Sequence, residues 1–214
     1  MNYQAIIFDL DGVLCYTDTY HYQAWKQIAD EEHIYFDEEI NRRLRGVSRT
    51  DSLNIILERA KRVYTEKEKA ELARRKNEIY VSLLQSMTKE RLADGAIETL
   101  ECIKKCGIKT AVGSSSKNAP LILQRLGLEK YFDAVSDGNG LTRSNPNPEV
   151  FLKAVEMLDK RPCECLVVED AKAGIEAAYR GGFFSAAIGD AKNHIKATYE
   201  IGRLSDLVKI VKAA

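Results

Sequence analysis

Four short apolar runs, separated by helix-like stretches, constrain the fold more than any other feature of this sequence. The runs cover residues 5–8, 108–112, 165–168 and 184–188. Continuous apolar runs of this length are typical of strands that are buried on both faces of a parallel sheet. Because strands alternate with helices, we expect right-handed βαβ units and an α/β fold with a Rossmann-like parallel sheet core.

Residues 16–91 break this alternation. They have helical periodicity and no convincing strand, and the stretch 58–80 is dense in Glu, Lys and Arg, which predicts an amphipathic, solvated helix. We therefore expect a helical cap domain of residues 16–91, inserted after the first strand. The α/β core domain would comprise residues 1–15 and 92–214, and a total of 214 residues suits two such domains.

Composition excludes several classes of partner. Lys plus Arg equals Asp plus Glu, 32 each, so no net charge favours nucleic acid or a membrane surface. No apolar stretch approaches the ~20 residues that span a bilayer, and the first residues do not resemble a signal peptide. The five cysteines form no CxxC pair, which predicts reduced thiols in a cytoplasmic protein. Since no heptad run demands assembly, we expect a monomer.

Polar side chains follow three of the four apolar runs. Asp9 and Asp11 come after the first run, Ser114 after the second, and Glu169 and Asp170 after the third. Ligands of open α/β sheets bind beyond the carboxyl ends of the strands, so these groups are predicted to meet at one rim. Any one of these sites alone is more often a helix N-cap than a functional site, but the three together form an ordered pattern.

The residue types at this rim suit phosphoryl transfer. Mg²⁺ prefers carboxylates together with phosphate and water, and Asp9, Glu169 and Asp170 offer such oxygens. An aspartate can also act as a nucleophile and form an aspartyl phosphate. A second carboxylate two residues on, Asp11, can serve as general acid and base, and Gly12 allows the sharp turn between them and the following chain.

Three motifs carry a resemblance to a known superfamily. Asp9-Leu10-Asp11-Gly12-Val13 resembles the first motif of the haloacid dehalogenase superfamily, Ser114 matches its second, and Glu169-Asp170 with Ala173-Gly174-Ile175 resembles its fourth. The resemblance implies a phosphoryl group carried on Asp9, acid–base catalysis by Asp11 and a phosphate contact from Ser114. It also implies one Mg²⁺ per chain, with the ligands Asp9, Asp11, Glu169 and Asp170.

Within the superfamily, stretches of this sequence that lie mostly in the predicted cap resemble the β-phosphoglucomutase family. The stretches that carry it are residues 17–25, 44–53, 75–77 and 114–118. The family interconverts β-glucose 1-phosphate and glucose 6-phosphate through β-glucose 1,6-bisphosphate, so a second phosphate site is needed in the cap, where Arg49 suits bidentate binding. The resemblance implies these substrate-binding residues: His21, Trp25, Gly46, Val47, Ser48, Arg49, Ser52, Lys76, Ser115, Ser116, Lys117 and Asn118.

Helical spacing by itself supports plainer interpretations of the cap residues. A lone tryptophan such as Trp25 belongs more often to a core than to a ligand site. Lys76 lies in a charged helix, where a solvated position is typical, and His21 alone is typical of surface or core. The family resemblance favours the binding roles.

Asn145 departs from the superfamily pattern. The third motif usually contains a lysine within Ser-Lys-Pro-x-Pro, whereas residues 144–148 here read Ser-Asn-Pro-Asn-Pro. An amide donates hydrogen bonds but carries no charge. Three interpretations remain open: Lys117, Arg143 or Lys172 supplies the missing charge, the enzyme is weakened and uses another phosphosugar, or the chain is an engineered variant.

Three functions therefore compete. The first is a β-phosphoglucomutase-like isomerase of carbohydrate metabolism, with a sugar phosphate as its small-molecule partner. The second is a phosphosugar phosphatase, in which water activated by Asp11 attacks the aspartyl phosphate. The third is a non-catalytic phosphosugar-binding protein, which only Asn145 favours and which has no need of the paired aspartates Asp9 and Asp11.

Overall fold

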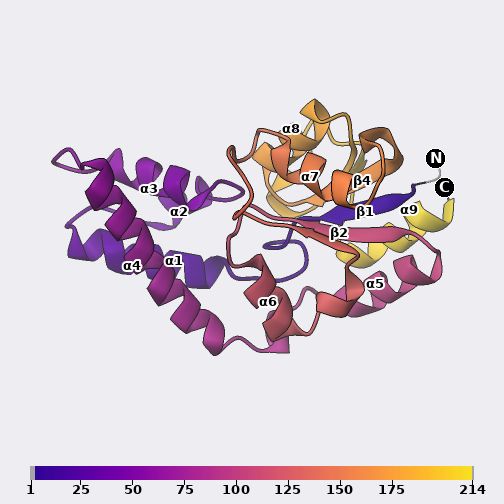
Figure 1. Ribbon diagram of the computed structural model, residues 1–214, viewed down its shortest axis with the longest axis horizontal. Helices are drawn as coiled ribbons and strands as arrows, with labels where there is room; N and C mark the ends of the chain where they lie inside the picture. The colour runs from indigo at the N-terminus through magenta and orange to yellow at the C-terminus, as the bar shows by residue number, and fades with distance from the viewer. Residues whose placement is uncertain (1–2, 214) are drawn as a thin grey trace.

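A six-stranded, wholly parallel sheet forms the centre of the computed structural model, which describes residues 3–213 (Figure 1). The strand order is β3-β2-β1-β4-β5-β6. In register, Ile7 of β1 lies opposite Ala111 of β2 on one side and Val167 of β4 on the other. The strands are β1 (Ala5–Phe8), β2 (Lys109–Gly113), β3 (Ala134–Ser136), β4 (Cys165–Glu169), β5 (Phe184–Ala187) and β6 (Tyr199–Glu200).

The predicted α/β parallel sheet is confirmed, and all four apolar runs form strands within one residue of their predicted ends. The two edge strands, β3 and β6, were not predicted from the sequence. They span three and two residues, and β3 carries the half-buried pair Ala134 and Val135, so neither presents a continuous apolar run.

Helices cover both faces of the sheet (Figure 1). Alternate residues of β1 pack on opposite sides: Ile6 and Phe8 contribute to one apolar cluster, and Ala5 and Ile7 to another. The first cluster includes residues of α5, α6 and α9, the second residues of α7 and α8. These helices are α5 (Ala96–Lys105), α6 (Ala119–Leu126), α7 (Glu149–Met157), α8 (Lys172–Arg180) and α9 (Leu207–Ala213), and short 3-10 helices include η4 (Gly189–Ala191).

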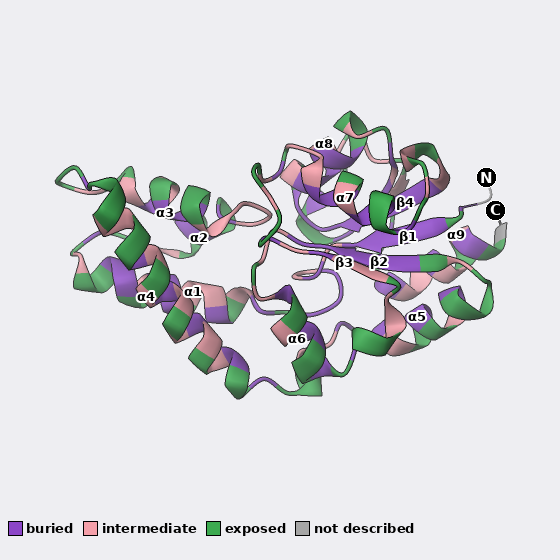
Figure 2. Cartoon of the chain, viewed as in Figure 1, coloured by how far each residue is buried: buried purple, intermediate pink, exposed green. Residues whose placement is uncertain are grey.

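Four helices stand to one side of the sheet and form what we call the cap (Figures 1 and 2). They have an apolar cluster of their own, in which Trp25, Ile28, Leu53 and Leu72 are buried. We propose residues 16–91 as the cap domain and residues 1–15 and 92–214 as the core domain. The cap helices are α1 (Asp18–Glu31), α2 (Glu38–Arg42), α3 (Arg49–Leu57) and α4 (Glu66–Gln85).

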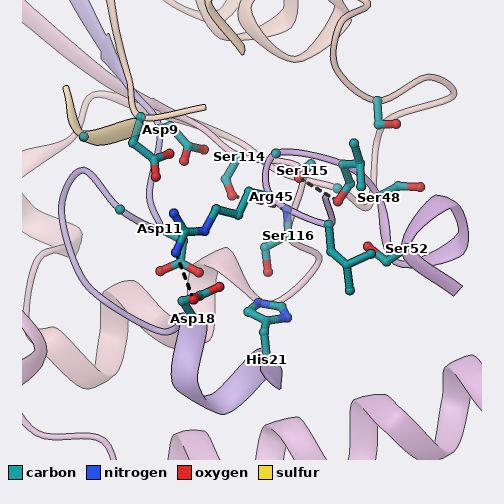
Figure 3. Close-up of a pocket in the computed structure, with 18 of the residues that line it drawn as sticks. Asp9, Asp11, Asp18, His21, Arg45, Ser48, Ser52, Ser114, Ser115 and Ser116 are labelled. Atoms are coloured by element: carbon teal, nitrogen blue, oxygen red, sulfur yellow. Dashed lines mark hydrogen bonds and ion pairs between the residues drawn. The ribbon is translucent and has the colours of Figure 1, made fainter. Parts of the chain in front are cut away.

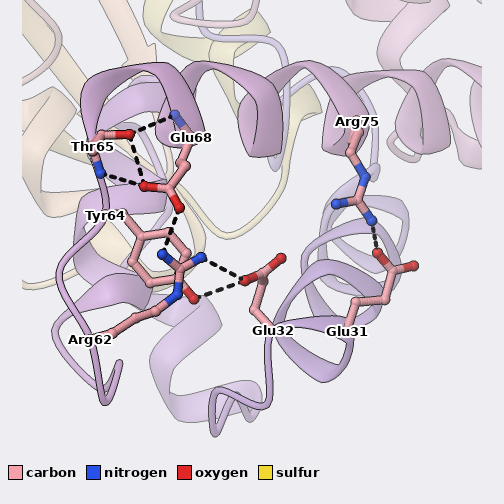
Figure 4. A network of polar contacts seen from close by, with 7 residues as sticks. All are labelled: Glu31, Glu32, Arg62, Tyr64, Thr65, Glu68 and Arg75. Atoms are coloured by element: carbon pink, nitrogen blue, oxygen red, sulfur yellow. Dashed lines mark hydrogen bonds and ion pairs between the residues drawn. The ribbon is translucent and has the colours of Figure 1, made fainter.

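The charged helix of the cap begins later than the sequence suggested. We expected one helix over residues 58–80, but α3 ends at Leu57 and α4 starts at Glu66. Thr65 and Glu68 form a capping box, in which Thr65 N donates to Glu68 Oε2 at 2.8 Å and Glu68 N donates to Thr65 Oγ1 at 3.3 Å (Figure 4). This reciprocal cap starts a helix at the next residue.

Two further sequence predictions concern membranes and thiols. Within residues 3–213, no helix has both the length and the apolar character that a bilayer span requires. All five cysteines are unpaired, and Cys15 and Cys165 are buried.

Candidate active site

The polar residues that follow β1, β2 and β4 meet at one rim of the sheet, where Figure 3 shows Asp9 and Ser114. β1 lies between β2 and β4, so the carboxyl ends of the three strands are adjacent. Asp9 N donates to Val168 O at 2.9 Å, and Ser114 N donates to Ser136 O at 3.0 Å, so both residues still continue the sheet ladder. The predicted convergence of Asp9, Ser114 and Asp170 at one rim is therefore observed.

Three carboxylates form a compact group there. Asp9, Glu169 and Asp170 each offer an oxygen within 4.8 Å of the others. Burial, and then the charges of Glu169 and Asp170, raise the pKa of Asp9 well above its usual range. Burial and Asp11 raise the pKa of Asp170 to about 7. Buried carboxylates that repel one another are the oxygen donors a hard divalent cation neutralises, so this set fits Mg²⁺.

Two glycines make room for these carboxylates. A Cβ at Gly12, whose φ is +84°, would lie 2.1 Å from Asp170 Oδ2. A Cβ at Gly174 would lie 1.9 Å from Glu169 Oε1. Both distances are far below van der Waals contact, so the first and fourth motifs need glycine at these positions.

Asp11 stands apart from the three-carboxylate group. Its Oδ1 accepts a hydrogen bond of 2.6 Å from Thr17 N, at the start of the cap. Burial raises the pKa of Asp11 to about 6, while the bond from Thr17 opposes the rise. A carboxyl group with a pKa near neutrality suits proton transfer. Asp11 is not one of the three grouped carboxylates, and metal ligation by Asp11 stays a prediction.

Asn145 lies below the rim. Its Nδ2 donates to Glu169 Oε1 at 3.4 Å, and its Oδ1 is buried without a hydrogen-bond partner among the described residues. Of the cations considered as replacements for the missing lysine, Lys117 and Arg143 line the adjacent cavity with exposed side chains. Lys172 is exposed at the first position of α8 and is not part of the cavity wall.

A cavity of about 940 Å³ separates the rim from the cap. Glu169 and Asn145 are buried behind its wall, and every other predicted site residue lines it. From the rim and the core loops these are Asp9, Asp11, Ser114, Ser115, Ser116, Lys117, Asn118 and Asp170; from the cap they are His21, Trp25, Gly46, Val47, Ser48, Arg49, Ser52 and Lys76.

The cap side of the cavity carries two cations without an acidic partner. Among residues 3–213, neither Arg49 nor Lys76 forms an ion pair with a carboxylate. Lys76 is only 2% exposed, and its Nζ lies 2.8 Å from His21 Nδ1 and 4.5 Å from the centre of the Tyr80 ring. Burial, and then the charge of Arg49, lower the pKa of Lys76 well below its usual range. A buried lysine and a half-buried arginine with no acidic partner suit an anionic ligand.

Besides the bond from Thr17 to Asp11, four polar contacts between the cap and the core involve residues that line the cavity. Ser115 Oγ donates to Val47 O at 3.4 Å, and Asn118 Nδ2 donates to Asn77 Oδ1 at 2.8 Å. The other two join Asp51 with Ser144 and Arg45 with Asp190, each at 2.5 Å. The sequence pointed to no role for Arg45, Asp51 or Asp190, although Arg45 lies beside Gly46 within a motif that carried the resemblance.

A group of buried carboxylates at the rim of a parallel sheet faces a helical cap across a cavity, an arrangement that suits a capped phosphoryl-transfer enzyme. A family model of haloacid dehalogenase-like hydrolases matches residues 3–182. The chain belongs to this family, as its motifs implied.

Within the family, the chain resembles β-phosphoglucomutases. It is 42% identical to the β-phosphoglucomutase of Bacillus subtilis, over 95% of this chain and 91% of that protein. The crystal structure of β-phosphoglucomutase from Clostridium difficile superposes with a TM-score of 0.93 and 36% identity, over 100% of this chain and 96% of the other. A phosphorylated carbohydrates phosphatase of Thermotoga maritima is 32% identical, over 84% and 82% of the two chains.

Proposed function

We propose that this enzyme is a β-phosphoglucomutase, which interconverts β-D-glucose 1-phosphate and D-glucose 6-phosphate in the cytoplasm as a monomer. The observation that carries the proposal is the cavity, which has carboxylates at its core end and the unpaired cations Arg49 and Lys76 at its cap end. A mutase must hold one phosphate at each end of one sugar. A cavity with two such ends supports that task, as does the similarity to β-phosphoglucomutases.

In this proposal Asp9 is the nucleophile. Its carboxylate oxygen bonds to phosphorus while the bond from phosphorus to the sugar oxygen breaks, and Asp11 gives a proton to that oxygen. In the second half-reaction the 6-hydroxyl of β-glucose 1-phosphate attacks the aspartyl phosphate, its proton passes to Asp11, and the bond between phosphorus and Asp9 breaks. The product of this half is β-glucose 1,6-bisphosphate, which then gives its other phosphoryl group to Asp9 in the first half-reaction and leaves as glucose 6-phosphate.

The remaining residues bind and orient. Asp9, Glu169 and Asp170 would hold one Mg²⁺, which supplies a positive charge that neutralises the transferring phosphoryl group. Ser114 would contact the phosphoryl group, and Arg49 the distal phosphate. The other lining groups proposed to contact the substrate are His21, Trp25, Gly46, Val47, Ser48, Ser52, Lys76, Ser115, Ser116, Lys117 and Asn118, of which Lys76 lies at the same cap end as Arg49.

Hydrolysis is the second candidate function. The Thermotoga maritima relative and the fructose-1-phosphate phosphatase of Escherichia coli, which is 28% identical over 84% of this chain, act on phosphorylated sugars as phosphatases. The same Asp9 and Asp11 would then transfer the phosphoryl group to water. The two functions share the first half-reaction and differ only in the acceptor.

A labelling experiment tests the shared step. The enzyme with Mg²⁺ is mixed with β-glucose 1,6-bisphosphate that carries ³²P, quenched in acid and treated with hydroxylamine, which cleaves acyl phosphates. We expect protein-bound label that hydroxylamine releases, and none in Asp9→Asn. Equal labelling of Asp9→Asn would contradict Asp9 as the carrier.

A further inference from the structure

Arg45 joins two carboxylates that belong to different parts of the fold. Its Nη2 donates to Asp18 Oδ2 at 3.1 Å, and its Nη1 donates to Asp190 Oδ2 at 2.5 Å (Figure 3 shows the Asp18 pair). Asp18 is the first residue of α1 in the cap, where Asn41 Nδ2 also donates to it at 3.1 Å. Asp190 lies in η4 of the core. Asp18 thus holds the Arg45 side chain in place on the cap through Nη2, while Nη1 of the same guanidinium binds Asp190 of the core.

Among residues 3–213, Arg45–Asp190 is the one ion pair that connects residues 16–91 with the rest of the protein. The other polar contacts across this boundary, including the bond from Thr17 to Asp11, involve at most one charged group. Within the part of the chain that the structure describes, loss of the pair therefore removes the only ion pair in direct contact across the boundary.

The pair also lies beside the reacting groups. Arg45 precedes Gly46, whose φ is +74° and where a Cβ would lie 3.3 Å from the Cβ of Ala171 and 3.7 Å from Asn145 Nδ2. Arg45, Asp18, Asp190 and Asp170 line the same cavity. Formation of the pair therefore brings the loop of the cap down onto the core next to the carboxylates.

We propose that Arg45 is a positioning residue, which through Asp190 holds the cap closed on the phosphorylated enzyme, so that a sugar hydroxyl rather than water accepts the phosphoryl group. The inference rests on the proposed mutase function. In hydrolysis a water oxygen bonds to phosphorus as the bond to Asp9 breaks, and the proton of water passes to Asp11. A closed cap excludes that water, while the sugar is already enclosed in the cavity.

The test measures the ratio of free phosphate to glucose 6-phosphate formed from β-glucose 1-phosphate, Mg²⁺ and a trace of β-glucose 1,6-bisphosphate. We expect Arg45→Ala and Asp190→Ala each to raise the ratio about two- to fivefold, the scale of a partly exposed ion pair. The double variant should not exceed the larger single effect, because both substitutions remove one interaction. Arg45→Lys should retain most of the wild-type ratio.

Arg43→Ala is the matched control. Arg43 lies on the same segment and forms an ion pair of 2.8 Å with Glu58, but this pair stays within the cap, so the ratio should not change. An unchanged ratio in Arg45→Ala, an unchanged ratio in Asp190→Ala, or additive effects in the double variant would overturn the proposal.

Small-angle X-ray scattering of the unliganded proteins separates failure of this inference from failure of the mutase function. If the wild type releases only free phosphate, the mutase function is wrong and the ratio reports nothing about Arg45. The radius of gyration then decides: an increase in Arg45→Ala and Asp190→Ala, but not in Arg43→Ala, supports the closed-cap role. Equal radii would contradict it.

Discussion

Asn145 Nδ2 lies 3.4 Å from Glu169 Oε1, and both side chains are buried, Glu169 completely. The second oxygen of Glu169 accepts a hydrogen bond of 2.7 Å from Ala171 N, while the Oδ1 of Asn145 has no partner among the described residues. A neutral amide thus stands next to a group of three carboxylates, at the position where the motif resemblance implies a lysine.

The first prediction restores that charge. Asn145→Lys should raise single-turnover phosphoryl transfer at least about tenfold, because a preorganised cation beside the transferring group is typically worth about 10²–10³ in rate. Rapid-quench kinetics with β-glucose 1,6-bisphosphate measure the step. Asn145→Gln keeps the amide and should give no gain. No gain from the lysine would show that another cation, such as Lys117 or Arg143, already supplies the charge.

The second prediction concerns the cap end of the cavity. Arg49→Ala should lower kcat/KM for β-glucose 1-phosphate by on the order of 10²-fold, because a bidentate contact to the distal phosphate is lost. Arg49→Lys should recover part of this, since a single ammonium replaces the planar fork. Arg59→Ala, at an exposed position of the same cap, is the control. Equal kinetics for Arg49→Ala and Arg59→Ala would exclude Arg49 from substrate binding.

The third prediction uses the raised pKa of Asp170. A carboxyl group whose pKa is raised in the folded state, here to about 7, stabilises the fold below its unfolded pKa and loses this contribution as pH rises through about 7. We therefore compare the free energies of unfolding of Asp170→Asn and the wild type without divalent ions. The difference, variant minus wild type, should increase by on the order of 2–4 kcal/mol between about pH 4 and pH 8.

Urea unfolding at a series of pH values measures the difference for Asp170→Asn. Added Mg²⁺ should stabilise the wild type at pH 8 and leave the variant nearly unchanged, because ligand binding stabilises only the state that binds it. Parallel pH curves for the two proteins would contradict repulsion within the carboxylate group.

The fourth prediction concerns the buried cation Lys76. Its lowered pKa means that the unfolded chain binds the proton more tightly, so wild-type stability should rise with pH between the lowered value and the ordinary value near ~10.4. Lys76→Met removes this slope and should be the more stable protein near neutral pH. Lys67→Met, at an exposed position of the same helix, should follow the wild type.

Glucose 6-phosphate distinguishes a functional Lys76 from a merely buried one. The ligand should raise the melting temperature of the wild type and of Lys67→Met, and raise that of Lys76→Met less. If Lys76→Met keeps the wild-type pH slope and the full ligand response, burial of the charged Lys76 does not lower the stability of the fold, and Lys76 does not bind the anionic ligand.

The rim of the sheet was predictable because each of its residues follows a local pattern. Asp9 comes after a fully apolar run, and Gly12 and Gly174 stand where a Cβ would collide with Asp170 and Glu169. The start of α4 was also encoded locally, in Thr65 and Glu68, but the dense charge of residues 58–80 masked this signal. Local signals were therefore sufficient wherever one strand or one turn determines the position.

The contacts across the cavity were not predictable in this way. Asp190 pairs with Arg45 at a separation of 145 residues, and no local pattern links them. The same holds for Asp51 and Ser144, which are 93 residues apart. Such pairs depend on how the cap meets the core.

The most direct test of the proposed function is the product formed from β-glucose 1-phosphate with Mg²⁺ and a trace of β-glucose 1,6-bisphosphate, followed by enzymatic detection of glucose 6-phosphate and colorimetric detection of phosphate. We predict glucose 6-phosphate in large excess over free phosphate, and no turnover in Asp9→Asn. Free phosphate without glucose 6-phosphate would contradict the mutase function and leave the phosphatase. The absence of any turnover in wild type and Asn145→Lys alike would leave a binding protein.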